Sequence, residues 1–87
     1  MGLKMMAKAR VRSTEFDSLL RSELEILIKQ ANLGYENTII AQRYFLDSVA
    51  QADIAAELYY SRSTISSRLP GIITKMKNTA RRLGYTP

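Results

Sequence analysis

Apolar residues recur along the first third of the chain at intervals of three or four, which predicts an amphipathic α-helix. In chain order these positions are Phe16, Leu20, Leu24, Leu27 and Ala31. Ser13 or Thr14 is the expected N-cap, because either hydroxyl can accept a hydrogen bond from the free amides of a first helical turn. The segment Asn32 to Gly34 carries residues that end helices. We therefore expect a long N-terminal helix.

Residues 37–48 predict a second, shorter helix that opens with Asn37 as its N-cap. Its apolar positions are Ile39, Ile40, Tyr44 and Phe45. We expect the two aromatic side chains to fill the core rather than to stack on nucleic-acid bases. The helix should end around Asp47 or Ser48.

Residues 52–69 combine two short helical patterns of opposite character. The first has one apolar face around Ile54, so it is stable only when that face is packed. The second begins at Ser61, a favourable N-cap, and buries Ile65 and Leu69. Its outward positions are Arg62, Ser63, Ser66 and Ser67. A packed helix that holds a second, acid-free helix across a tight turn is typical of a helix-turn-helix that reads DNA.

The apolar positions that follow Ser61 keep their helical phase across Pro70. These positions are Ile65, Leu69, Ile72, Met76, Ala80 and Leu83. The preserved phase favours one long bent helix, although a proline in a helix interior costs about 3 kcal/mol. The alternative ends the first helix at Leu69 and begins another with Pro70 in its first position, which suits proline.

These patterns together predict an all-α fold of four to five helices with a long N-terminal helix, a helix-turn-helix and a basic C-terminal helix. The 87 residues are enough for one domain with a single modest core. We expect residues 13–87 to form that domain. Residues 1–12 are rich in lysine and arginine, and they are expected to form a flexible basic arm or a frayed terminus.

The charges are strongly segregated along the chain. The net charge is +5, yet residues 15–60 hold all eight acids against three cations. Residues 1–14 carry four cations and residues 61–87 carry six, and neither segment contains an acid. Such segregation favours a polyanionic partner, because each neutralised phosphate releases counterions. A solvated basic face is the alternative interpretation.

Composition argues against several classes of chemistry. The chain has no cysteine and no histidine, so it lacks the commonest general base and the commonest ligands of transition metals. We therefore expect no enzymatic activity, no metal and no cofactor. No apolar stretch approaches the roughly 20 residues that cross a bilayer, so we expect a cytoplasmic protein with no membrane partner.

The spacing of several residues resembles that of a known motif. The residues concerned are Ile54, Ala55, Leu58, Ser61, Thr64, Ile65, Ile72, Lys75 and Met76. Their order and intervals resemble the helix-turn-helix of LuxR-type response regulators. They also resemble region four of bacterial sigma factors and the small phage and plasmid regulators built like it, in which a segment similar to Arg43, Tyr44 and Phe45 precedes the first helix. The resemblance covers residues 39–76.

The resemblance implies roles for individual residues. Ala55 would be the small residue where the two helices cross, and Ser61 would cap the recognition helix. Arg62, Ser63, Ser66 and Ser67 would face the major groove. Two residues depart from the common pattern: Tyr59 stands where many such turns have glycine, and Arg68 stands where an apolar residue is usual. We expect Tyr59 to be tolerated because the turn need not be left-handed.

The remaining cations of this segment complete the candidate site. Arg68 either points toward a phosphate or indicates a different register within the helix. Lys75 and Lys77, and beyond them Arg81 and Arg82, are expected near the DNA backbone if the helix runs across it. The candidate DNA-binding residues are Ser61, Arg62, Ser63, Ser66, Ser67, Arg68, Lys75 and Lys77.

Two functions follow as hypotheses. The first is a sequence-preferring transcription regulator that binds double-stranded DNA as a homodimer, with its recognition helix in the major groove. Leu19, Ile26, Ile28 and Leu33 lie off the main stripe of the first helix, and so broad an apolar surface favours burial against a second subunit. The alternative is that the core of a five-helix domain absorbs this surface. The alternative function is a sigma-region-four-like module that binds RNA polymerase or another regulator.

Overall fold

The chain is mainly helical in the part that the computed structural model describes, which is residue 16 and residues 18–85. These residues contain no strand, so the predicted all-α class is confirmed for them. The predicted basic arm over residues 1–12 lies outside the described residues, as do the predicted caps Ser13 and Thr14. None of the described helices is long and apolar enough to cross a membrane.

The first described helix begins later than the apolar stripe predicts. Helix α2 spans Arg21–Gln30, and a turn precedes it. The Glu23 carboxylate accepts a hydrogen bond from the Leu20 amide at 2.9 Å, which satisfies one of the free amides at the helix start. The long N-terminal helix is therefore not confirmed. Its end is confirmed, because the chain leaves helical geometry at Asn32, whose φ is 57°.

The next helix begins before the cap that the sequence predicts. Helix α3 spans Tyr35–Ala41 and runs into the π-helical turn η1 at Gln42–Leu46. Asn37 is thus the third residue of the helix, and its predicted role as N-cap is wrong. Gly34 takes that position with a φ of 93°, a conformation open to glycine and strained for other residues, and its carbonyl accepts from the Thr38 amide at 2.9 Å.

The last two helices follow the predicted pattern closely. Helix α4 spans Gln51–Leu58 and helix α5 spans Arg62–Leu83. Pro70 lies inside α5, so the prediction of one continuous helix is confirmed and the alternative of a new helix at Pro70 is wrong. At 22 residues, α5 is about 33 Å long.

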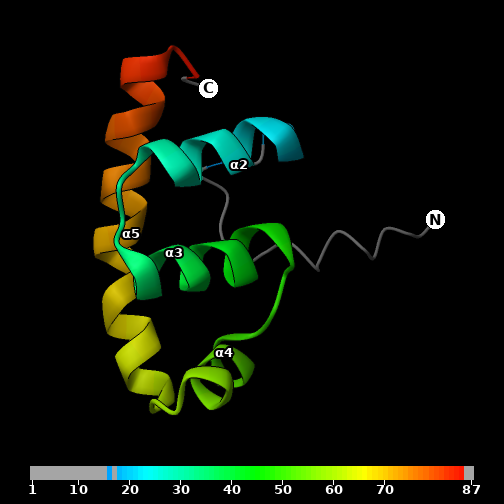
Figure 1. Ribbon diagram of the computed structural model, residues 1–87, viewed down its shortest axis with the longest axis vertical. Helices are drawn as coiled ribbons and strands as arrows, with labels where there is room; N and C mark the ends of the chain where they lie inside the picture. Colours follow the sequence, from blue (N-terminus) through cyan, green and yellow to red (C-terminus); the bar gives the residue numbers. More distant parts are fainter. Residues whose placement is uncertain (1–15, 17, 86–87) are drawn as a thin grey trace, which may run out of the picture.

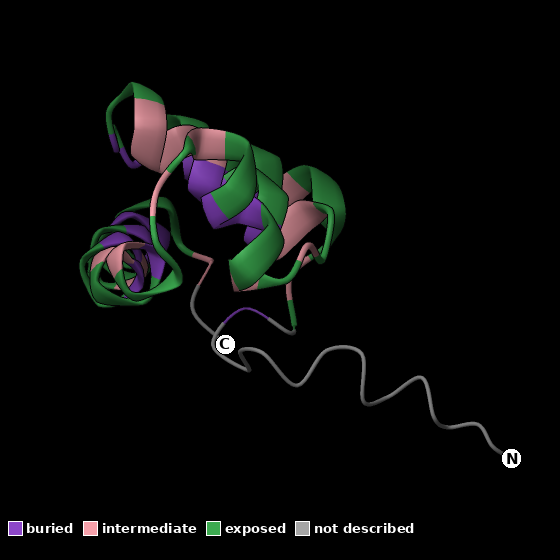
Figure 2. Ribbon diagram, turned by 90° about the horizontal axis from the view of Figure 1, so that it is seen from below, coloured by how far each residue is buried: buried purple, intermediate pink, exposed green. Residues whose placement is uncertain are grey.

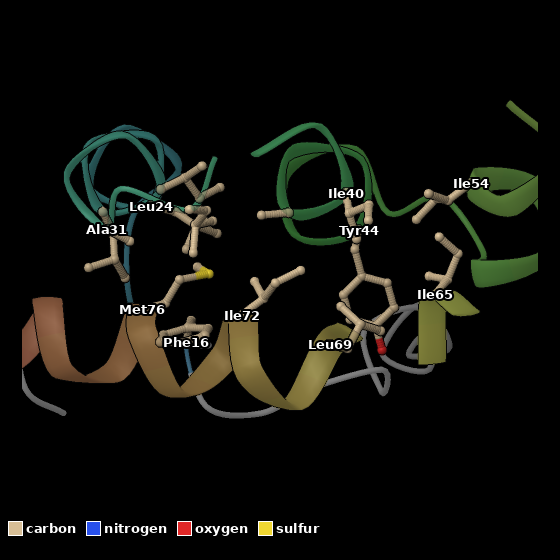
Figure 3. Packing of buried hydrophobic residues seen from close by; sticks show 14 of the residues in the cluster. Phe16, Leu24, Ala31, Ile40, Tyr44, Ile54, Ile65, Leu69, Ile72 and Met76 are labelled. Carbon is tan, nitrogen blue, oxygen red and sulfur yellow. The ribbon is translucent and has the colours of Figure 1, made fainter. Parts of the chain in front are cut away.

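Helix α5 forms one side of the molecule, and the other helices pack against it in succession. Figure 1 shows α2, α3 and α4 beside successive portions of α5, and Figure 3 shows α2 and α3 nearly end-on above it. The predicted stripe of α5 supplies much of the core, since Ile65, Leu69, Ile72, Met76 and Ala80 are buried. Seen along α5, the buried residues of each helix face the others while their outer faces are exposed (Figure 2). Leu83, the last residue of the predicted stripe of α5, is not buried, because 38% of its surface is exposed.

The aromatic residues of η1 lie in the core, as predicted. Tyr44 is buried and Phe45 is half-buried. The Phe45 ring makes edge-to-face contacts with both neighbours, at centroid distances of 5.0 Å to Tyr44 and 5.4 Å to Phe16. These contacts join the segment before α2 to the middle of the chain.

The helical backbone at Gly71 leads to a stability prediction. A methyl group added at Gly71 would meet no atom within 4 Å, so Gly71→Ala should stabilise the protein by about 1 kcal/mol through the lower entropy of the unfolded chain. Gly34→Ala is the matched contrast, because the space there is equally open but φ is positive, and it should destabilise. Urea denaturation followed by circular dichroism measures both. Equal effects of the two substitutions would contradict the conformational explanation.

Candidate nucleic-acid interface

The turn between α4 and α5 is short and held by backbone hydrogen bonds. Tyr59 ends α4 in a left-handed conformation, with φ 61° and ψ 38°. The amide of Tyr60 then donates to the carbonyl of Ala55 at 2.9 Å, which closes the helix end. The expectation that this turn needs no left-handed residue is therefore wrong. The side chain of Tyr59 projects into solvent with 94% of its surface exposed.

Ser61 caps α5, as the sequence predicts. Its hydroxyl oxygen accepts from the Thr64 amide at 3.3 Å. The same hydroxyl lies 3.0 Å from the hydroxyls of both Ser63 and Thr64. Because these contacts direct the Ser61 hydroxyl toward its own helix, capping is its main role and little of its hydrogen-bonding capacity is left for a ligand.

The outward residues of the first turns of α5 lie where the sequence places them. Arg62, Ser63, Ser66 and Ser67 are all exposed. All three hydroxyls have a partner within the protein: Ser67 donates to the Thr64 carbonyl at 2.9 Å, Ser66 donates to the side chain of Gln51 at 2.6 Å, and Ser63 lies 3.0 Å from the Ser61 hydroxyl. Arg62 is the one of the four whose side chain makes no hydrogen bond or ion pair with another described residue.

Arg68 does not point freely toward solvent. Its guanidinium lies 3.1 Å from the Glu36 carboxylate and also donates to the Asn37 side chain at 3.3 Å. It stacks 4.9 Å from the centre of the Tyr60 ring. These contacts do not leave the Arg68 side chain free to extend toward a phosphate, which is one of the two interpretations drawn from the sequence. The residue instead ties α5 to the first turn of α3.

The same cluster lowers the pKa of one acid and raises that of its partner. The Tyr60 hydroxyl donates to the Glu36 carboxylate at 2.7 Å, and together with Arg68 it holds the pKa of Glu36 below its ordinary value of 4.5. The hydrogen bond to Glu36 in turn raises the pKa of Arg68. Both groups therefore stay ionised at neutral pH.

Lys75 and Lys77 are both exposed but lie on different sides of α5. Side chains two positions apart on a helix differ in direction by about 200°. Lys75 lines an open hollow of about 660 Å³ with Asn32 and Arg82, on the side of the α2 end. Lys77 points away from that hollow's side of the helix. The structure thus brings Arg62, Ser63, Ser66 and Ser67 together, and it does not gather all eight predicted residues on one surface.

The acids that form ion pairs among the described residues mostly bind cations outside α5. Arg43 binds Glu57 at 2.9 Å and Asp47 at 3.2 Å, while Arg21 pairs with Asp47 and Glu25. Within residues 18–85, Arg68 is the only α5 cation in an ion pair. The unpaired cations are Arg62, Lys75, Lys77, Arg81 and Arg82. They give this helix a positive surface that no described carboxylate neutralises.

One residue near this surface was missed by the sequence interpretation. Gln51, the first residue of α4, accepts the hydrogen bond from Ser66, and with Ala50, Ala52 and Arg62 it lines a hollow of about 450 Å³. No side chain caps the start of α4. The Asp53 amide donates to the Ala50 carbonyl at 3.0 Å, so the first two amides of the helix remain available beside Arg62. The absence of a capping residue at Ala50 is the sequence signal that points to these free amides.

The described residues include no cluster of three or more side chains of the kinds that hold metal ions. No group of three or more acids among them is placed to hold a metal ion, and the chain lacks histidine and cysteine.

The chain matches no protein-family model, and no curated protein or solved structure shows significant similarity to it. The functional interpretation therefore rests on this chain's own residues.

The contacts among Glu36, Tyr60 and Arg68, called here the Glu36 cluster, predict that the stability of the protein depends on pH. Because the folded pKa of Glu36 lies below its ordinary value of 4.5, the stabilisation is fully present above pH 4.5 and is lost as pH falls through the lowered pKa. Glu36→Gln should therefore destabilise the protein at neutral pH, and the difference from the parent should shrink in acid. Urea denaturation at a series of pH values measures this difference. A gap that stays constant with pH would show that the carboxylate charge is not responsible.

Proposed function

We propose that the protein is a transcription regulator that binds double-stranded DNA with sequence preference, using α4 and α5 as a helix-turn-helix. Helix α5 is the proposed recognition helix, with its N-terminal turns in the major groove. The observation that carries the proposal is the exposed, acid-free start of α5 beside a buried stripe that fixes its direction. Short serine side chains there require close approach of the helix to the base edges.

Charge supports the same proposal. Five cations of α5 have no carboxylate partner among the described residues, so phosphate binding would not have to break an ion pair within that set. Arg62 also lies beside the uncapped start of α4, where the helix dipole favours an anion. Arg62 is therefore the residue expected to contribute most, through either a phosphate or a guanine.

A homodimer is part of the proposal. Leu20 and Ile26 are 66% and 44% exposed in or next to α2, and such side chains favour burial against another chain. Two copies on one DNA site would double the phosphate contacts. The same exposed residues support the second candidate function, a sigma-region-four-like module that binds RNA polymerase or another regulator. In both cases we expect the protein to act in the cytoplasm.

The first test removes the proposed anchor. Arg62→Ala should weaken binding to a labelled DNA duplex by about tenfold, because a charge-assisted contact is lost, and should lower the salt dependence by about one phosphate. Fluorescence anisotropy from about 50 mM to about 200 mM salt measures both quantities. Lys29→Ala, which removes the same charge from the last turn of α2, is the matched control. No binding at low salt, or affinity unaffected by Arg62→Ala, would favour the interaction module.

A second test separates DNA binding from fold stability. Ser63 is the second residue of α5, where an acid interacts favourably with the helix dipole. Ser63→Asp should therefore keep or raise the melting temperature, yet it should weaken DNA binding by about tenfold or more through repulsion of phosphates. Ser63→Ala, which leaves the charge unchanged, should have a smaller effect on affinity. Unchanged affinity of the Asp variant would place Ser63 away from the duplex.

A further inference from the structure

Tyr59 occupies a backbone conformation that is poorly suited to its side chain. It is left-handed, with φ 61°, a region that glycine and asparagine enter more easily than a bulky residue. Strain of this kind persists only where the surrounding structure enforces it, and it is a reason to look for a function of the side chain.

The neighbours of Tyr59 do enforce the conformation. On its N-terminal side, Leu58 packs against the core. On its C-terminal side, Tyr60 is held by its hydrogen bond to Glu36 and by the guanidinium of Arg68 over its ring. Ser61 is fixed as the cap of α5. The turn therefore has little freedom to relax around Tyr59.

The side chain of Tyr59 returns nothing to the fold that would offset this strain. It is 94% exposed, and among the described residues its ring and hydroxyl make no aromatic contact and no hydrogen bond. A glycine would satisfy the backbone better and would lose no internal contact. The tyrosine is thus explained more readily by an external partner than by stability.

We propose that Tyr59 binds the sugar-phosphate backbone of DNA, with its ring against a deoxyribose and its hydroxyl donating to a phosphate. This proposal rests on the DNA-binding function proposed above and adds a contact to it. Tyr59 lies two residues before the cap of α5 and three residues before Arg62, and both are exposed. A tyrosine combines an apolar ring with a hydrogen-bond donor, which suits a partner that is part sugar and part anion.

The surroundings of Tyr59 favour DNA over a protein partner. No acid follows Tyr59 in the chain, and the preceding acid, Glu57, is paired with Arg43. The other large exposed apolar residues are Leu20, Ile26, Tyr35 and Leu83. They lie next to or within α2, at the start of α3 and at the end of α5. The charged residues that follow Tyr59, beginning with Arg62, are all cations, which favours an anionic partner over a protein partner that buries a continuous apolar patch.

The test exploits the opposite effects expected on stability and on binding. Tyr59→Gly should raise the melting temperature by about 4–8 °C, because the backbone strain is relieved. The same variant should weaken binding to a labelled duplex by about tenfold. Tyr59→Asn also tolerates the left-handed conformation and keeps a side chain, so it should show the same loss of affinity without the added flexibility of glycine. Tyr59→Phe should retain part of the affinity.

The controls distinguish this proposal from the function on which it rests. Tyr35→Ala removes a tyrosine that is 83% exposed at the start of α3 and should leave affinity unchanged. If Arg62→Ala weakens binding but Tyr59→Gly and Tyr59→Asn do not, the Tyr59 contact is wrong and the DNA-binding function stands. An equal loss in Tyr35→Ala would also overturn the Tyr59 contact. Absence of duplex binding by the parent protein would overturn both proposals.

Discussion

The structure depends on the burial of one face of α5. Ile65, Ile72 and Met76 are almost completely buried, and they contact α2, α3 and α4 along successive portions of a single helix (Figure 3). Because each residue along a helix turns by about 100°, fixing these three side chains also fixes the direction of every exposed residue on α5. The core and the candidate interface are thus two faces of the same element, and a shift in packing would rotate the interface.

The Glu36 cluster adds a polar constraint to this apolar one. Arg68 joins α5 to α3, and Tyr60 joins the preceding turn to the same carboxylate. An ion pair that is partly open to water contributes modestly by itself, but here one acid holds two points of the chain on either side of the Ser61 cap. The cluster therefore fixes the entry into α5 as well as its packing. Its cation, Arg68, is one of the residues that the sequence offered as a candidate for DNA binding.

The sequence predicted the faces of the helices better than their ends and their partners. The buried stripe of α5, its continuity through Pro70 and the Ser61 cap follow from local spacing and local chemistry, which a single sequence displays. The predicted start of α3 at Asn37 was wrong because Gly34, with its positive φ, begins the helix in place of a polar cap. The pairing of Arg68 with Glu36 was missed because the two residues are 32 positions apart, and helical periodicity carries no information about such distant pairs. The left-handed Tyr59 was missed because the handedness of the turn is imposed by the packing on both sides of it.

The ion pairs also determine where the positive charge of the described residues lies. Most cations of the described residues fall into two unlike populations. Arg21 and Arg43 are occupied by neighbouring acids in the middle of the chain, so they contribute little field at the surface. The cations of α5 follow the last acid in the sequence, and apart from Arg68 they have no carboxylate partner among the described residues. Among the described residues, the positive potential available to a polyanion is consequently concentrated on α5, and this concentration is the physical basis of the proposed interaction with DNA.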